Sequence, residues 1–303
     1  MKCLKKRGFT LVELMVVIAI IGILAVALTT QVTKIQDSAR AMKCKANLRS
    51  LAQAAQNYGV ETAHYPLAGS LETMEMTREG PRYQGHPGWV AWTAGNRDAW
   101  PWGNNKGSQD KNSHWSEMTR ETCFGEMGYL SITNGELWER VGKDASVYRC
   151  DKHKGVGEKK VYRSYVMNGY FQYDDKGGTT SGERRRTVEE SIRDGRAAIR
   201  LMFAEIPAQE MREEKEFTDS VLEYEMDKEA NKKKESIGFN HFVAKRWVGH
   251  VVFVDGHVEG IVLPSKAKKG DGTPDYSHKD LINLTGQLCD GQEITSDLRA
   301  TMQ

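Results

Sequence analysis

The sequence predicts an α+β protein, in which one long N-terminal helix packs on a C-terminal antiparallel β-sheet domain with loop and helical insertions. The first sign is that residues 1–63 contain no proline and that, from Phe9 on, apolar residues follow one another and later recur at helical spacing. The second is a pair of β-rich runs around Asp255-Gly256. With 303 residues, the chain is long enough for one or two compact units beyond the helix.

The N-terminal segment has the length and polarity of a membrane span. The basic cluster Lys5-Lys6-Arg7 and Gly8 precede an apolar run from Phe9 to Leu28. At about 1.5 Å per residue, a helix over this run covers the roughly 30 Å of a bilayer's hydrocarbon core. Glu13 lies near the start of the run, where a carboxylate in lipid is disfavoured by up to about 3 kcal/mol. We therefore expect Glu13 to have a partner.

The helical pattern continues beyond the apolar run. Gly59 is a plausible C-terminal stop, so the sequence predicts one helix from Phe9 to about Tyr58, roughly 75 Å long. Charged residues occupy its other faces after Leu28. Two apolar rows recur at helical spacing, and they consist of Val32, Ile35, Ala39, Met42 and Ala46, and of Cys44, Leu48, Leu51, Ala55 and Tyr58.

The run from Arg7 to Leu24 resembles the type III signal of type IV pilins and type II secretion pseudopilins. These families combine a short basic leader, a glycine, a Phe-Thr-Leu-(Val/Ile)-Glu motif and a hydrophobic helix. The resemblance implies that a prepilin peptidase cuts between Gly8 and Phe9 and methylates the Phe9 amine. It also implies that Glu13 pairs with the N-terminus of a neighbouring pilin or pseudopilin subunit, at the inner-membrane assembly machinery. An ammonium and a carboxylate that are each costly in lipid compensate one another.

Two other interpretations of this segment stay open. Ala25-Val26-Ala27 would suit an ordinary secretory signal, although Glu13 inside the apolar region argues against it. The segment could also be an uncleaved signal anchor. All three interpretations leave the basic cluster in the cytoplasm and export the rest. We expect a single-pass protein of the bacterial inner membrane, with its C-terminal domain in the periplasm and then in a pilus, pseudopilus or cell surface.

The expected organisation is a cleaved leader over residues 1–8, a transmembrane and amphipathic stem helix over 9–60 and an exported globular domain over 61–303. The formal net charge of +2 depends on four basic residues in the first seven positions. Without them, 39 basic residues face 41 acidic ones, which gives −2. The excess of basic residues therefore lies in the leader. The rest of the chain has no net positive charge that would predict a nucleic-acid partner.

Cysteine is sparse, and four of the five cysteines lie beyond the expected leader. An even number in an oxidising compartment permits up to two disulfides in three pairings. No C-x-x-C pair occurs, so the sequence indicates neither a zinc ribbon nor a thioredoxin-like site. The four residues are Cys44, Cys123, Cys150 and Cys289.

Later motifs are similar to those of pilin-like proteins with a C-terminal H-X9-DG motif. The similarity covers most of the chain but departs in spacing, because thirteen residues separate His241 from Asp255 and four separate His250 from it. An insertion around residues 245–248 would explain this, with His241 as the family histidine. The motifs include Lys43–Leu48, Tyr65-Pro66, Gly135–Trp138, Val147–Asp151, Arg163–Gly169, Phe203–Glu205 and Val251–Val258.

Asp255 and Gly256 separate the β-rich runs Val251–Val254 and His257–Leu263. A two-residue Asp-Gly loop favours a type I′ hairpin, because both central residues need φ > 0. The alternative is a metal site built from His241, His250, His257 and Asp255, although nothing in the sequence places the four on one face.

The segment Gly270–Asp275 is a candidate calcium loop, of a kind that major pseudopilins often carry near the C-terminus. Asp271 and Asp275 could supply some of the six to eight oxygens that calcium needs. Neighbouring lysines oppose this, so a turn-rich surface loop is the favoured interpretation. No other cofactor is indicated.

Residues 86–115 hold most of the tryptophans, among Gly, Asn, Ser and Pro. Exposed tryptophans can stack on sugars or form protein-binding hot spots. They can equally fold inward and hold a long loop in place. The charge-dense segment 210–236 predicts a solvated helix or a mobile excursion. The candidate ligand-binding residues are Trp89, Trp92, Trp100 and Trp102.

The chain carries no catalytic signature such as G-x-S-x-G, H-E-x-x-H, a Walker loop or a dinucleotide fingerprint. Together with the resemblance to pilins and pseudopilins, this implies a structural subunit of a type IV pilus or type II secretion pseudopilus, and not an enzyme. The alternative is a membrane-tethered binding module, for carbohydrate among other ligands, that uses the pilin export route. A periplasmic enzyme with an unrecognised site is a third class.

Overall fold

The computed structural model describes residues 10–69, 73–77, 80–84, 87–91, 123–153, 160–171, 186–208, 220–222 and 236–302. The chain divides into two compact units, Met1–Ala39 and Arg40–Gln303. The second unit combines helices with a six-stranded sheet and a separate two-stranded ribbon, as the α+β prediction requires.

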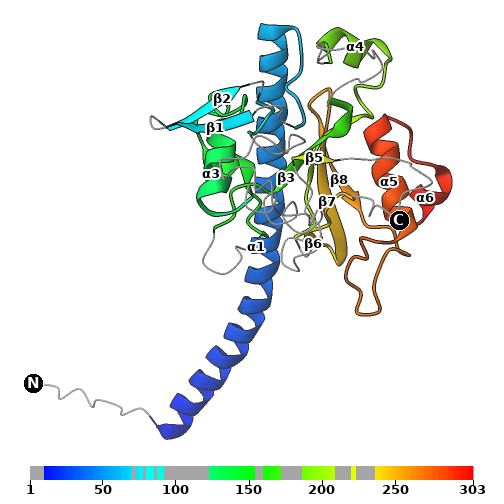
Figure 1. Cartoon of the computed structure of the whole chain (residues 1–303). Coiled ribbons are helices and arrows are strands. Elements are labelled where there is room, and N and C mark those ends of the chain that lie inside the picture. The colour runs from blue at the N-terminus through cyan, green and yellow to red at the C-terminus, as the bar shows by residue number, and fades with distance from the viewer. Residues whose placement is uncertain are drawn as a thin grey trace, which may run out of the picture. The chain divides into compact units, whose positions relative to one another are not determined.

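Helix α1 (Leu11–Thr62) is the longest element and contributes its second half to the larger unit (Figure 1). It ends later than predicted. Gly59 lies inside the helix, where a Cβ would meet Val188 Cγ2 at 2.7 Å. The glycine therefore allows close packing against α4 (Val188–Arg193) and does not stop the helix. The stop comes at Ala63, whose φ of 64° is left-handed.

Five strands of the main sheet follow the order β5-β3-β4-β7-β6, and β8 pairs with the other edge of β7. Strands β4 and β6 share one edge of the long strand β7, since β4 pairs with residues 251–253 and β6 with residues 246–248. The strands are β3 (Tyr165–Asn168), β4 (Leu201–Glu205), β5 (Val221–Leu222), β6 (His241–Val243), β7 (Arg246–Phe253) and β8 (Val258–Val262).

One pair of strands departs from the predicted antiparallel sheet. β5 runs parallel to β3, with Met167 opposite Val221. Both edges of β4 are already occupied by β3 and β7. β5 pairs with the other edge of β3, and both β3 and β5 run opposite to β4. All other pairings described in the sheet are antiparallel.

Helices cover the two faces of the sheet, with α1 on one side and α5 (Lys279–Asp290) and α6 (Ser296–Ala300) on the other (Figure 1). Alternate residues of β7 divide between them, since Val252 belongs to the core under α1 and Val251 to the core under α5. A register shift between Leu201 and Phe203 in β4 places two consecutive residues, Met202 and Phe203, in the α1 core.

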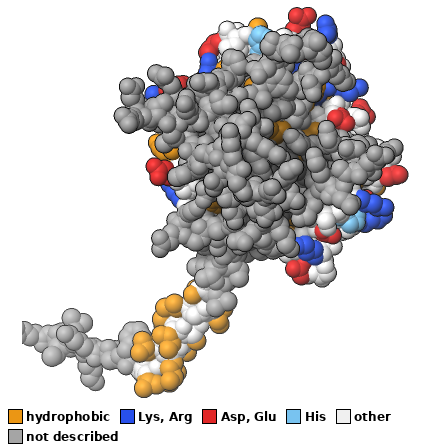
Figure 2. Space-filling view, viewed as in Figure 1, with side chains coloured by type: hydrophobic (Ala, Val, Ile, Leu, Met, Phe, Trp, Pro, Cys, Tyr) orange, Lys and Arg blue, Asp and Glu red, His pale blue; other side chains and the backbone are white. Residues whose placement is uncertain are grey.

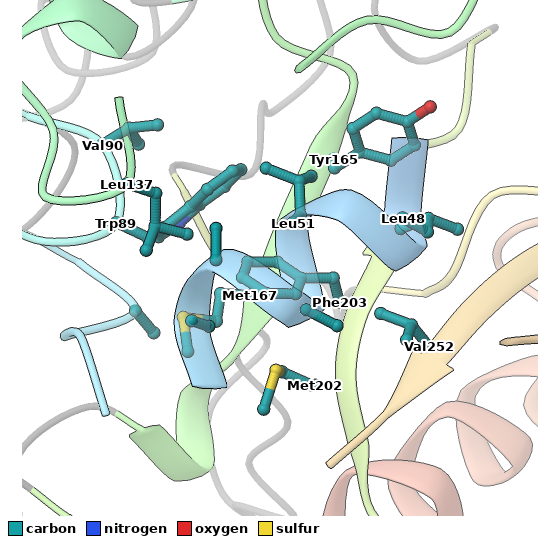
Figure 3. Close-up of a cluster of buried hydrophobic side chains, with 14 of the residues drawn as sticks. Leu48, Leu51, Trp89, Val90, Leu137, Tyr165, Met167, Met202, Phe203 and Val252 are labelled. Carbon is teal, nitrogen blue, oxygen red and sulfur yellow. The ribbon is translucent and has the colours of Figure 1, made fainter. Parts of the chain in front are cut away.

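The remaining elements lie around these layers. They are the ribbon of β1 (Thr73–Thr77) and β2 (Gly80–Gln84), helix α3 (Gly125–Thr133) and the 3₁₀ turns η1 (Ala145–Tyr148) and η2 (Gly169–Phe171). The core under α1 gathers Leu48 and Leu51 of the helix against Phe203 and Trp89 (Figure 3).

Candidate functional site

The start of α1 carries a local hydrogen-bond network around Glu13. The backbone N–H and the hydroxyl of Thr10 donate to Glu13 Oε2 at 2.8 and 2.7 Å, and the Glu13 N–H donates back to Thr10 Oγ1 at 3.3 Å. This reciprocal pattern is a capping box. Glu13 thus accepts the hydrogen bond of a backbone N–H group that would otherwise be unpaired at the N-terminus of its own helix. The predicted processing residues Gly8 and Phe9 lie outside the described residues.

The first half of α1 presents a continuous apolar surface. The side chains from Leu11 to Leu24 are exposed, with relative exposures of 70% for Leu11 and 71% for Ile23 (Figure 2). Within the residues that the structure describes, no helix meets the length and hydropathy expected of a membrane span.

The second half of α1 separates the two predicted apolar rows. Leu48, Leu51 and their row are buried against the sheet, whereas Ile35 and Met42 of the other row are 67% and 70% exposed. Asn47 joins the buried face and donates to the carbonyls of Ser146 and Arg149 at 3.0 and 2.9 Å. The helix is thus held along one face by both apolar packing and directed hydrogen bonds.

A buried polar cluster lies where this helix meets the sheet. Ligand-type atoms of four residues lie within 4.8 Å of one another, and they belong to Cys44, Cys150, Glu205 and His241. The two sulfurs are 2.8 Å apart, and Cys150 Sγ is 3.5 Å from His241 Nε2. Glu205 Oε1 is 3.2 Å from the same Nε2. Glu205 and His241 are completely buried.

Four separate elements position the cluster. Cys44 lies on the buried face of α1, and Cys150 follows η1. Glu205 ends β4, two residues after Phe203, so it points to the same face of the sheet as Phe203 does. His241 opens β6 and pairs in register with Val248. The cluster therefore forms only when helix, loop and sheet come together.

The carboxylate of Glu205 is further bound by two neighbours. His250 Nδ1 lies 2.8 Å from Oε1, and Asn240 Nδ2 donates to Oε2 at 2.8 Å. Burial opposes ionisation of Glu205, but His241 and His250 outweigh it and hold the pKa of the carboxyl below its usual range. Burial also lowers the pKa of His241, yet Glu205 and the Cys44 sulfur raise it to about 10 on balance.

The four described cysteines form no disulfide with one another in this structure, and all are buried. The hydrogen bond to Cys150 lowers the pKa of Cys44, while the same contact and burial raise the pKa of Cys150. Cys123 lies elsewhere and accepts a hydrogen bond from Arg163 Nη2 at 3.0 Å. Of the pairings that the sequence left open, the geometry brings together the sulfurs of Cys44 and Cys150.

Asp255 and Gly256 lie in the turn between β7 and β8, but the turn is not the predicted type I′. Gly256 has a φ of 88°, whereas Asp255 keeps a negative φ. Phe253 N–H donates to His257 O and Gly256 N–H to Phe253 O, which makes a three-residue loop with glycine in the left-handed position. Asp255 instead accepts a hydrogen bond from His257 N–H at 3.0 Å.

The alternative metal site of four residues is only half assembled. His241 and His250 lie together, with ring centroids 4.7 Å apart, but His257 and Asp255 contact each other at the exposed turn. Between His241 and Asp255 the chain turns from β6 into β7 through Ala244 and Lys245, which both have positive φ.

Trp89 is a core residue, as the inward-folding interpretation expects, and this corrects its place among the candidate ligand-binding residues. Its ring stacks on Tyr148 at 6.0 Å. It also meets Phe203 edge-on at 5.1 Å (Figure 3). Its Nε1 donates to Ser220 O at 3.1 Å, so the indole has neither free surface nor a free donor. Trp92, Trp100 and Trp102 lie outside the described residues.

Asp271 and Asp275 occupy separate local turns. Asp271 Oδ1 accepts from the N–H and hydroxyl of Thr273, and Asp275 Oδ1 accepts from those of Ser277. Each carboxylate is therefore used by its own loop. Calcium binding there stays a prediction.

Sequence reasoning missed two of these features. The capping box could have been recognised, because Thr10-Leu11-Val12-Glu13 has the S/T-x-x-E spacing. The buried cluster gave no such signal, since positions 44, 150, 205 and 241 have no spacing that indicates a common site. The motifs shared with the pilin-like proteins do contain Cys44, Cys150 and Glu205, and His241 is the expected family histidine, but nothing in the sequence joins them into one site.

Comparisons with known proteins find one family motif and several relatives. The prokaryotic N-terminal methylation motif matches residues 3–29. Type II secretion system core protein G of Pseudomonas aeruginosa is 32% identical over 107 residues, which cover 33% of this chain and 70% of that protein. The same protein of Escherichia coli is 35% identical over 77 residues, which cover 25% of this chain and 52% of that protein.

Type IV major pilin protein PilA of Myxococcus xanthus is 41% identical over 61 residues, which are 20% of this chain and 28% of that pilin. The chain thus spans about half, or less, of two of these three relatives. No solved structure matches the chain. The methylation motif and the coverage of core protein G show that this chain belongs to the pseudopilin family of type II secretion system core protein G, which is related to type IV pilins.

Proposed function

We propose that this protein is a structural, non-enzymatic subunit of a type IV pilus or type II secretion pseudopilus, assembled through α1. The observation that carries the proposal is the exposed apolar surface from Leu11 to Leu24, which has Glu13 near its start and lies within the methylation motif. Isolated surfaces of this size are unfavourable in water, so lipid and neighbouring stems are its natural environments.

Processing is the first step of the proposed function. A prepilin peptidase cleaves between Gly8 and Phe9 and methylates the new amine, as the motif over residues 3–29 suggests. Intact-mass measurement of the protein purified from its own cells tests this step. A chain that begins at N-methylated Phe9 supports the proposal, whereas a chain that begins at Leu28 contradicts it.

The proposed location follows from charge. Lys5, Lys6 and Arg7 precede the apolar run, so the positive-inside rule keeps them in the cytoplasm and exports the domain. The subunit then resides in the inner membrane, from which the assembly machinery extracts it into the filament.

In the filament, Glu13 sets the register by pairing with the Phe9 amine of a neighbouring subunit. Its network with Thr10 uses only one carboxylate oxygen, Oε2, for both donors. The other oxygen, Oε1, takes no part in the capping box and can accept from a second chain. Helix capping and inter-subunit pairing are therefore compatible.

Two variants separate these roles. Glu13→Val removes both, and we expect a processed, membrane-inserted subunit that is missing from filaments. Thr10→Ala weakens the capping box but keeps the carboxylate, so it should still assemble. Filament yield, with intact mass as a control for processing, decides between them. Normal assembly of Glu13→Val would exclude the register role, and equal loss in both variants would assign Glu13 to helix capping alone.

A further inference from the structure

We propose that Cys44, Cys150, Glu205 and His241 bind one Zn²⁺ ion in a buried site that fastens α1 to the sheet. The inference concerns the globular unit and does not depend on filament assembly. Two sulfurs, an imidazole and a carboxylate are the ligand types that zinc uses in proteins.

The distances agree with a tetrahedral zinc site along two edges. With zinc bonds of about 2.3 Å to sulfur and about 2.1 Å to nitrogen or oxygen, a tetrahedron has an S···N edge of about 3.6 Å and an N···O edge of about 3.4 Å. The protein has 3.5 Å between Cys150 Sγ and His241 Nε2, and 3.2 Å between that nitrogen and Glu205 Oε1. The S···S edge is about 3.8 Å, so the sulfurs, now 2.8 Å apart, must separate by about 1 Å.

The orientation of His241 distinguishes this cluster from a thiol-based catalytic triad. In a triad, one ring nitrogen faces the nucleophile and the other faces the carboxylate. Here the Cys150 sulfur and the Glu205 oxygen both face Nε2. The Nδ1 atom is buried with no hydrogen-bond partner among the described residues. Ligand atoms that converge on a common point are the arrangement of a metal site.

A disulfide between Cys44 and Cys150 is the competing structure, because the sulfurs are close. It would account for two of the four residues. It would leave Glu205 and His241, both fully buried, beside an uncharged and weakly accepting disulfide. In that structure Glu205 and His241 would compensate each other as a buried pair, held by His250 and Asn240, and would have no part in the link between the cysteines. Zinc gives all four residues a role, so we favour it.

Side chains next to the four proposed ligands are placed to orient them or to hydrogen-bond with them, as is usual around metal sites. His250 and Asn240 hydrogen-bond the two oxygens of Glu205 and so fix the orientation of the carboxylate. The Tyr165 hydroxyl is fully buried near Cys44 and has no nitrogen or oxygen partner among the described residues. A thiolate bound to zinc is a suitable acceptor for it.

The first test measures metal and thiol state together in the full-length protein, purified in detergent without chelators. Elemental analysis should find one zinc per chain. After unfolding with a chelator but without reductant, an alkylating reagent should modify both Cys44 and Cys150. A zinc-free protein with a Cys44–Cys150 disulfide would overturn the proposal. Two free thiols with no zinc, even after equilibration with Zn²⁺, would overturn it too.

Cobalt replaces zinc as a spectroscopic probe. Equilibration of chelator-treated, reduced protein with Co²⁺ should give the intense visible and near-ultraviolet bands of a tetrahedral cobalt–thiolate centre, and one equivalent of Zn²⁺ should remove them. Weak octahedral bands alone would contradict the assigned geometry. This measurement uses the unaltered sequence, so it does not depend on a variant that folds.

Variants then assign the ligands. Cys44→Ser and Glu205→Gln should each lose the bound zinc, while Cys123→Ser, which changes a buried cysteine outside the cluster, should keep one equivalent. His250→Gln should weaken zinc affinity about 10- to 100-fold, the range for residues that orient a ligand. Full zinc retention in Cys44→Ser would refute the site, and equal loss in Cys123→Ser would show that the variants act through misfolding.

Discussion

The two halves of α1 belong to one helix but have opposite environments. From Leu11 to Leu24 the apolar side chains are exposed, whereas Leu48, Leu51 and Ala55 have no exposed surface at all. The second half is also held by polar contacts. Asn47 donates to two carbonyls, Gln56 Nε2 donates to Val254 O at 2.9 Å, and Cys44 joins the buried cluster.

The difference shows that helical periodicity does not say what covers a helix. Apolar side chains stabilise the fold where the sheet of the same chain covers them. Where no such cover is described, the same kind of side chain favours assembly with other subunits. Substitutions in the second half should therefore change the stability of the subunit, and those in the first half its assembly. The variants below test that division in order of decreasing effect.

Leu51→Ala and Leu24→Ala are the same chemical change in the two halves. Leu51→Ala should lower the free energy of unfolding by about 2–5 kcal/mol, because it leaves a cavity in a fully packed core. Leu24 is 57% exposed, so Leu24→Ala should stay within about 0.5 kcal/mol of the parent. Denaturant unfolding of the dispersed subunit measures both. Comparable losses in the two variants would contradict the division.

Asn47→Ala should cost about 1–3 kcal/mol, since it leaves the partly buried carbonyls of Ser146 and Arg149 without their donor. Arg49→Ala, at an exposed position two residues away, is the control and should have little effect. Hydrogen exchange of residues 145–150 adds a local readout. If those amides keep their protection in Asn47→Ala, the side chain does not hold the segment to the helix.

The two glycines of the helix should respond in opposite directions. A methyl group on Gly22 would meet no atom within 4 Å, so Gly22→Ala should stabilise the helix locally by about 1 kcal/mol. At Gly59 the new methyl would meet Val188, so Gly59→Ala should cost about 1 kcal/mol or more despite its better propensity. Hydrogen-exchange protection of the helix amides near each site measures the changes. Stabilisation by Gly59→Ala would show that α4 shifts at little cost to accommodate the new methyl group.

The smallest effect is expected at the ion pair of Lys43 with Asp151, whose atoms are 2.9 Å apart at a partly exposed site. A double-mutant cycle of Lys43→Ala and Asp151→Ala should give a coupling of about 0.2–1 kcal/mol that falls with added salt. A larger coupling that salt leaves unchanged would mean that this contact fastens the helix as strongly as Asn47 does.

Much of the architecture could be predicted from local patterns. The absence of proline and the apolar period predicted a helix close to Leu11–Thr62, and the runs around Asp255 predicted the β7–β8 pair. The errors concern contacts between distant segments. Gly59 looked like a stop because its neighbour Val188 is far away in sequence, and Trp89 looked available because Tyr148 and Phe203 are distant too.

The sequence by itself determined the helix, its apolar first half with one carboxylate, and the motif that marks the family, because each depends on residues within a few turns of one another. Only the tertiary structure decided which of two apolar rows is buried, that β5 runs parallel to β3, and that Cys44, Cys150, Glu205 and His241 meet. These outcomes depend on packing between elements that are far apart in the chain. The spacing of residues along the sequence does not show which distant elements pack together.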